Sequence, residues 1–333
     1  MPDCKTPLSR RGFVTSSASL TGGALLTTLL PQTGFAAAPK ADKQTPGIYR
    51  LKVGDIEITA LLDGHMGLHS TVIHGYDQER AQTAFDKNFR KNPFPDGTLP
   101  IPVNGYIINT GDRLIAVDAG TADHFGPDLG HLKSNMELAG YRAQDVDIVY
   151  ITHLHADHVG GLIDKAGKAV FPNAELITHE TDWNFWHDDG ILSQVPEPVK
   201  KFFHIARSSV KPYANNKTLI GDGFEIAPGI TSMALPGHTP GHSGLAIQSG
   251  NQEVLIWGDI IHATALQFAN PEWTLVFDID GDMARKTRMK ILDQVASDRT
   301  PVLGMHLDFP GAGHVERDGE AFRYHASSWQ YLL

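Results

Sequence analysis

Short apolar runs separated by turn-forming residues dominate the hydrophobic pattern of this chain. Two pairs of such runs, over residues 49–62 and 103–117, are each interrupted by a Gly-Asp dipeptide and predict β-hairpins. Residues 148–151 are continuously apolar and too few for a helix, which is typical of a buried strand. Further strands are predicted at residues 174–179, 224–226, 230–235, 243–248, 253–257 and 302–305.

Apolar residues at helical spacing predict helices over residues 129–139 and 282–296, and the aromatic-rich segment 181–213 is expected to be helical as well. Residues 64–102 contain histidines and several prolines, so we expect an irregular segment that acts as a lid or as a contact in a homodimer. Strands followed by a helix occur twice along residues 48–333. This order predicts an α/β protein built as an αββα four-layer sandwich.

The first 38 residues have the features of an export signal. Ser9-Arg10-Arg11 begins a twin-arginine pattern, a weakly apolar stretch follows, and Ala36-Ala37-Ala38 supplies a cleavage site. We therefore expect export by the twin-arginine route to the periplasm, with residues 39–47 as a linker. An uncleaved membrane anchor is the alternative, but the small polar residues in the stretch disfavour a stable span.

The composition indicates the class of protein, its net charge and its lack of disulfides. With 41% hydrophobic and 20% charged residues, the 333-residue chain resembles soluble globular proteins. Removal of residues 1–38 would leave 25 of the 28 basic and 37 of the 38 acidic residues, which moves the net charge from −10 to −12. Such a surface disfavours nucleic acid as a partner. The single cysteine, Cys4, would leave with the signal, so no disulfide is expected.

Four side chains of the types that can bind metals follow the predicted strand 148–151. His153 and His155 alternate, so both can point the same way in an extended segment. The adjacent Asp157 and His158 must point elsewhere, and one short loop can therefore serve two metal ions. Imidazole nitrogen and carboxylate oxygen suit zinc, although manganese, cobalt or iron would also fit this donor set.

One loop cannot complete two metal sites, and three later residues are candidates for the remainder. His238, Asp259 and His306 each follow an apolar run that predicts a strand, as the first loop does. Ligands at strand ends along one edge of a sandwich would converge on one cleft. A polar loop that is rich in histidine by chance would not repeat this placement.

With these motifs the chain resembles the metallo-β-lactamase fold of binuclear metallohydrolases, and most of all its periplasmic lactonase and methyl parathion hydrolase branch. The likeness covers residues 48–333, including segments 171–174 and 309–311. The resemblance implies one metal site of His153, His155 and His238, a second of Asp157, His158 and His306, bridging Asp259, and a supporting Asp118. His242 lies four residues after His238, but the resemblance assigns the metal to His238.

The resemblance also implies a mechanism. Two zinc ions about 3.5–4 Å apart lower the pKa of a bound water to near 7 and stabilise the attacking and departing oxygens. Asp259 would orient a bridging hydroxide that attacks a carbonyl carbon or phosphorus, with Asp157 as the other catalytic carboxylate. No separate general acid can be identified in the sequence.

The resemblance further suggests the substrate pocket. The candidate wall residues are Phe125, Trp186, Phe203, His262 and Phe277. Each aromatic has the alternative of packing in the core. An aromatic wall favours a small apolar or aryl substrate. His262 departs from the apolar residue expected in organophosphate hydrolases, and it could hydrogen-bond a lactone or ester oxygen.

The sequence therefore predicts hydrolysis of lactones or aryl esters, with organophosphate triesters as a side activity. The alternatives within this fold are a primary organophosphate hydrolase, an acyl-homoserine lactonase, a β-lactamase or a thioesterase of the glyoxalase II type. The acidic surface disfavours a nuclease. A periplasmic metal-binding protein without catalysis is the alternative from another class, but a storage site needs no open coordination position.

Overall fold

The computed structural model describes residues 40–42 and 44–333. The predicted export signal lies outside the described residues and stays a prediction. Residues Thr45–Leu333 form one compact unit, which holds all the elements described below. Among the described residues, no helix combines the length and the apolar character that a membrane span requires.

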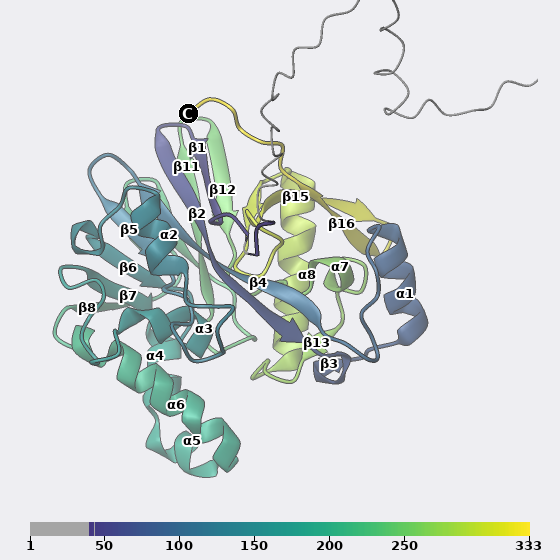
Figure 1. The fold of residues 1–333 in the computed structure, drawn as a ribbon, viewed down its shortest axis with the longest axis horizontal. Coiled ribbons are helices and arrows are strands. Elements are labelled where there is room, and N and C mark those ends of the chain that lie inside the picture. The colour runs from purple at the N-terminus through teal and green to yellow at the C-terminus, as the bar shows by residue number, and fades with distance from the viewer. Residues whose placement is uncertain (1–39, 43) are drawn as a thin grey trace, which may run out of the picture. The chain divides into compact units, whose positions relative to one another are not determined.

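Two seven-stranded sheets form the centre of this unit (Figure 1). The first sheet runs in the order β1 (Ile48–Val53), β2 (Ile56–Leu68), β4 (Leu99–Asn109), β5 (Leu114–Val117), β6 (Ile148–Ile151), β7 (Glu175–His179) and β8 (Lys217–Ile220). The second runs in the order β16 (Ala321–Ala326), β15 (Ala312–Asp318), β14 (Val302–Leu303), β12 (Gln252–Ile256), β11 (Ser243–Ser249), β10 (Ile230–Ala234) and β9 (Glu225–Ala227). Both sheets are mixed, because β5 to β8 pair in parallel and so do β12 and β14. A small separate pair joins β3 (Ile73–His74) to β13 (Thr274–Leu275).

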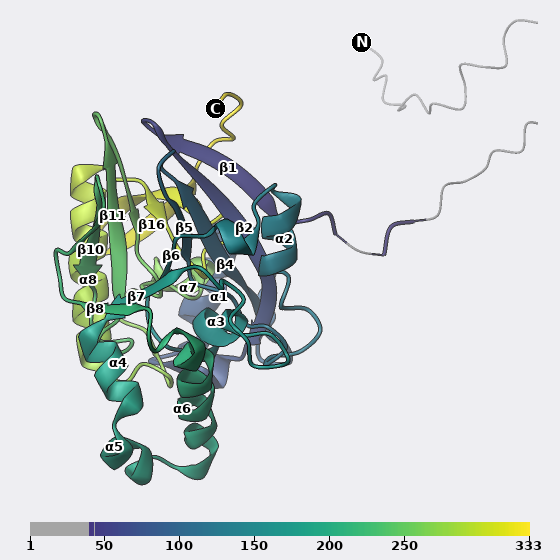
Figure 2. The same cartoon turned by 90° about the vertical axis from the view of Figure 1, so that its left-hand side faces the viewer.

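Helices cover the outer face of each sheet (Figure 2). The α-helices are α1 (Gln78–Lys87), α2 (Leu132–Leu138), α3 (Ala156–Val159), α4 (Glu180–His187), α5 (Asp189–Gln194), α6 (Glu197–Val210), α7 (Thr264–Gln267) and α8 (Gly281–Asp298). The 3-10 helices are η1 (Ser70–Val72), η2 (Ala143–Asp145), η3 (Gly160–Leu162) and η4 (Lys211–Tyr213). Helices α2, α3, α4 and α6 pack on the first sheet and α8 packs on the second. The predicted αββα sandwich is confirmed.

Strand β6 shows how the sequence supports this layering. Its side chains alternate between the two faces of the first sheet. Ile148 and Tyr150 lie in the core between the sheets, whereas Val149 and Ile151 pack against the helices. A strand buried on both faces is continuously apolar, and for this reason the sequence predicted its bounds correctly.

The prediction that residues 64–102 are irregular was wrong. Strand β2 continues to Leu68, α1 follows, and β4 begins at Leu99. Pro100 and Pro102 made β4 difficult to predict as a strand. Both lie in the part of β4 that pairs only with β2, because β5 pairs with β4 from Tyr106 onward. A proline needs no ladder donor on such a free side. Segment 181–213 is helical as predicted, but it is divided into three α-helices and the 3-10 helix η4.

Substitutions in the layer between the sheets test the packing. Ile256 is fully buried there, so Ile256→Ala should lower the free energy of unfolding by about 2–5 kcal/mol through lost burial and a cavity. Leu138→Ala, at a position 66% exposed, is the control and should change it by no more than about 0.5 kcal/mol. Chemical denaturation of the metal-free protein measures both, and equal losses would contradict this packing.

Candidate metal centre

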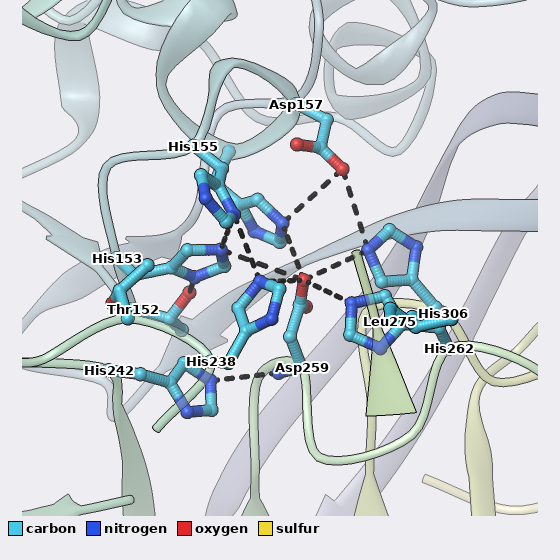
Figure 3. Close-up of polar contacts among 12 residues, drawn as sticks. Thr152, His153, His155, Asp157, His238, His242, Asp259, His262, Leu275 and His306 are labelled. Atoms are coloured by element: carbon cyan, nitrogen blue, oxygen red, sulfur yellow. Dashed lines mark hydrogen bonds and ion pairs between the residues drawn. The ribbon is translucent and has the colours of Figure 1, made fainter. Parts of the chain in front are cut away.

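Strand ends of both sheets carry the predicted ligands to one place (Figure 3). His153 and His155 follow β6 in an extended segment, and α3 then turns Asp157 and His158 to another side. The other three residues follow strands of the second sheet. His238 lies between β10 and β11, Asp259 follows β12, and His306 follows β14. The structure therefore brings all seven predicted ligands together.

The predicted ligand atoms other than those of Asp259 form two groups. In the first, His155 Nδ1 lies 3.0 Å from His153 Nε2 and 2.9 Å from His238 Nε2. In the second, Asp157 Oδ2 lies 3.5 Å from His158 Nε2 and 3.5 Å from His306 Nε2. Ligand atoms bonded at about 2.0–2.1 Å to one tetrahedral ion lie about 3.3–3.4 Å apart. Both groups thus have dimensions near those of a metal site.

The carboxylate of Asp259 lies between the two groups. Its Oδ2 atom is 3.6 Å from His153, 3.3 Å from His158, 3.3 Å from His238, 3.1 Å from His262 and 3.2 Å from His306, measured to Nε2 in each case. One oxygen that reaches members of both groups is suited to bridge two ions. Asp259, His262 and His238 also form a cluster of their own that could hold a metal.

In four of the histidine rings, the nitrogen that points away from the cluster has a hydrogen-bond partner. Nδ1 faces Thr152 Oγ1 at 3.1 Å in His153, Asp118 at 2.7 Å in His158, Asp278 at 2.7 Å in His238 and the Pro102 carbonyl at 2.7 Å in His306. Each partner favours the tautomer that carries its proton on Nδ1. In the neutral ring the Nε2 lone pair then points into the cluster, as metal binding requires. In His155 it is Nδ1 that faces the cluster.

Asp118 lies where the sequence predicted a supporting carboxylate. It follows β5 in the left-handed region, at φ 59°, and it accepts hydrogen bonds from the Thr152 amide and hydroxyl, each at 2.9 Å. Its contact with His158 therefore also joins the loop after β5 to the loop after β6.

Asp278 supports His238 in the same way, and the sequence analysis missed it. It accepts a 2.8 Å hydrogen bond from the Leu275 amide, and buried Arg288 lies 4.0 Å away. Nothing in the sequence separates Asp278 from Asp280 and Asp282, because only the fold brings it to the His238 ring.

His242 has a different role. Its Nδ1 donates to the Leu235 carbonyl at 2.8 Å, and its Nε2 accepts from the Asp259 amide at 2.8 Å. Burial lowers the pKa of His242 to about 3, so the ring is neutral and can accept. A side chain at Gly258 would collide with this ring, and the glycine has φ 57°. His242 thus fixes the backbone of Asp259, whereas the Nε2 atom of His238 lies 3.3 Å from Asp259 Oδ2.

The charges in the cluster depend on one another. Burial raises the pKa of Asp259, but the surrounding imidazoles outweigh this effect and hold it well below its usual value. Burial opposes protonation of His238, yet its hydrogen bonds to Asp259 and Asp278 raise its pKa to about 9. Burial lowers the pKa of His153 and of His155 well below the usual range. Asp259 therefore stays ionised and can attract cations.

The residues present fit two divalent cations. His158 Nε2 and Asp259 Oδ1 are buried and have no hydrogen-bond partner among the described residues. A buried polar atom of this kind is costly unless something binds it. Nitrogen and oxygen donors without thiolate suit zinc, manganese, cobalt or iron. The groups that could hold one ion include both predicted sets.

A pocket of about 430 Å³ opens beside the cluster. All five predicted pocket residues line it, namely Phe125, Trp186, Phe203, His262 and Phe277. Trp186 and Phe203 are 2% and 1% exposed, so they are also core residues on the buried faces of α4 and α6, whereas Phe125 is 41% exposed. Core packing and pocket lining are thus not exclusive alternatives here.

The pocket wall contains further apolar residues that the sequence analysis did not name. They are Met66, Ile101, Phe185, Val195, Val199, Phe202, Val276 and Ile279. They come from strands β2 and β4, from helices α4 and α6 and from loops, so no local pattern could have indicated them. His262 differs from these apolar residues, because its ring is buried with Nε2 close to Asp259 and with no hydrogen-bond partner on Nδ1 among the described residues. Its ring stacks on His306 at 4.9 Å between centroids.

Comparisons with solved structures agree with the fold. The crystal structure of hydrolase AbOPH, in the beta-lactamase superfamily, is 29% identical, with 86% of this chain and 100% of that chain covered and a TM-score of 0.81. The structure of AidC, described as a dizinc quorum-quenching lactonase in complex with a product, is 25% identical. It covers 86% of this chain and 99% of that chain, with a TM-score of 0.78.

Curated relatives match a shorter part. An N-acyl homoserine lactonase from Bacillus sp is 24% identical over 174 residues, which are 46% of this chain and 62% of the relative. The chain therefore spans less than two thirds of that relative. The family model of the metallo-beta-lactamase superfamily matches residues 98–306, which include every predicted metal ligand. The chain belongs to the metallo-beta-lactamase superfamily.

Proposed function

We propose that this protein is a binuclear metal-dependent hydrolase that acts on lactones or aryl esters, with organophosphate triesters as a side activity. The observation that carries the proposal is the position of Asp259 Oδ2 between two groups of ring nitrogens, beside an apolar pocket. His153, His155 and His238 would hold one cation, and Asp157, His158 and His306 the other. Two such cations, when bound, supply Lewis acidity and an acidified water.

The protein's own residues keep negative charge at the metal centre and exclude water from the substrate pocket. Asp259 and Asp157 keep negative charge at the centre, since the surrounding imidazoles lower the pKa of both. The apolar wall displaces water from the substrate and strengthens every polar contact within the pocket. No side chain in the pocket wall has an obvious role as a separate general acid.

His262 is suited to bind a substrate oxygen. Burial lowers its pKa to about 4, so at neutral pH the ring is uncharged and can donate one hydrogen bond. Its Nε2 faces the cluster and lies 3.1 Å from Asp259 Oδ2, whereas its Nδ1 is buried without a hydrogen-bond partner among the described residues. A lactone or ester carbonyl bound beside the cluster would be within its reach. This contact favours carbonyl substrates over phosphotriesters.

Two alternatives remain as specific candidates. The AidC complex holds an acyl-homoserine product, and the curated relatives are named N-acyl homoserine lactonases, which supports an acyl-homoserine lactone as one substrate to test. A primary organophosphate hydrolase is the second candidate. The apolar pocket of about 430 Å³ favours a small apolar substrate of either kind.

Removal of the metal tests the proposal as a whole. Chelation should abolish hydrolysis of a small panel of lactones, aryl esters and phosphotriesters, and added zinc or manganese should restore it. Metal analysis of the purified protein should find two ions per chain. Two ions without turnover of any substrate would favour a metal-binding protein without catalysis.

Asp259→Ala should remove the carboxylate that both groups of ring nitrogens share. We expect kcat/KM to fall by at least about 100-fold, or about 2.7 kcal/mol in transition-state stabilisation. The bound metal should fall below two ions per chain. His325→Ala is the control, because this exposed histidine pairs with Glu316 on β15 and should leave both values unchanged. Full activity in Asp259→Ala would refute the assignment.

His262→Leu should separate the substrate classes. Loss of one hydrogen bond to a carbonyl oxygen should reduce kcat/KM for an aryl lactone by roughly 10-fold, with a smaller change for paraoxon. His262→Gln keeps a donor and should retain more of the lactone activity. A wild-type preference for paraoxon over the lactone would make organophosphate hydrolysis the primary activity. Equal losses for both substrates in His262→Leu would contradict the role of His262 in the choice between them.

A further inference from the structure

Asp182, on the first turn of α4, contacts two of the loops that carry the ligands. We propose that Asp182 is a positioning residue that holds the loop of His153 and His155 in a fixed position relative to the loop of His238. This inference rests on the proposed metal centre. Asp182 forms no hydrogen bond to a ligand side chain among the described residues, so it would act through the backbone.

The contacts of Asp182 join segments far apart in the sequence. One carboxylate oxygen, Oδ2, accepts a 2.7 Å hydrogen bond from the amide of Leu154, the residue between His153 and His155. The other, Oδ1, accepts from the Thr239 hydroxyl and, at 3.2 Å, from the Gly241 amide. Both of these residues follow His238 in the loop between β10 and β11.

The loop at Gly241 packs directly on α4. A Cβ at Gly241 would lie 2.7 Å from the Cβ of Asp182 and closer still to its amide nitrogen, so only glycine permits this approach. The bases of the two loops are already joined where the Ser243 amide donates to the Thr152 carbonyl at 3.0 Å. Asp182 therefore fixes the parts of the loops nearest to the ligands.

The burial of Asp182 requires an explanation of this kind. Its side chain is fully buried, and a buried carboxylate is costly unless hydrogen bonds compensate for the lost water. Three donors from two loops provide this compensation, and each donor holds its loop in return. The same helix carries Trp186 one turn later, whose ring lies 5.4 Å from His155, edge to face. Helix α4 thus places the pocket wall and two ligand loops relative to one another.

The neutral variant Asp182→Asn tests the role, because an amide group would face donors that now bind a carboxylate oxygen. Gly241→Ala disturbs the same contact from the other side. Asp63→Asn is the matched control. Asp63 is equally buried and accepts hydrogen bonds from Thr121, Gly130 and Leu132, none of which is a neighbour of a ligand.

The measurement is zinc binding by full-length protein in competition with a chelating dye, alongside the melting temperature of the metal-free protein. We expect wild type to bind two ions. Asp182→Asn and Gly241→Ala should bind one ion with near wild-type affinity and the other roughly 10–100-fold more weakly, as changes around metal ligands do. Asp63→Asn should lower the melting temperature but bind both ions as wild type does.

Two results would overturn the inference. If Asp182→Asn binds both ions with wild-type affinity and only lowers the melting temperature, Asp182 has a purely structural role. Equal weakening of both ions would place its effect on the whole fold. Failure of the proposed function is distinguishable, because wild type would then bind two ions without hydrolysing any substrate, and one ion per wild-type chain would refute the centre itself.

Discussion

The site is governed by a buried carboxylate that has five imidazole nitrogens within 3.6 Å of one oxygen. So many ionisable groups can be buried together only if each is paired or bound. Asp118 and Asp278 meet this requirement on one side of the cluster, because each takes the far nitrogen of one ring. The other side, at Asp259, presents lone pairs that two cations would satisfy.

The fold holds the ligand side chains at the ends of buried strands, where the backbone can move little. Strands β6 and β14 and the last three residues of β12 are buried, and the ligands follow these strands within a few residues. A close-packed interior resists small displacements of such ends. His242 extends the same rigidity to Asp259 through the backbone amide. The ligand distances thus follow from strand positions that the hydrophobic core determines.

The sequence predicted what is local and missed what depends on distant packing. The apolar run 148–151 and the ligands behind it occupy one short stretch, so both could be predicted. Helix α1 was missed because its apolar face is short and packs on the small sheet of β3 and β13. Asp278 and Asp182 were missed because their partners lie up to 59 residues away, and an aspartate in a sequence does not reveal its hydrogen bonds.

Three histidines near Asp259 show that residue type alone does not determine function in this site. His238 has its Nδ1 bound by a carboxylate, so its Nε2 faces the cluster. His242 has its Nδ1 bound by a carbonyl, but its Nε2 is taken by the Asp259 amide, which leaves nothing for a metal. His262 lines the pocket, has no fixed partner on Nδ1 among the described residues, and contacts only the shared Asp259 oxygen through Nε2. The partner of each nitrogen, rather than the spacing between histidines, therefore separates a ligand from a backbone support and from a contact for substrate.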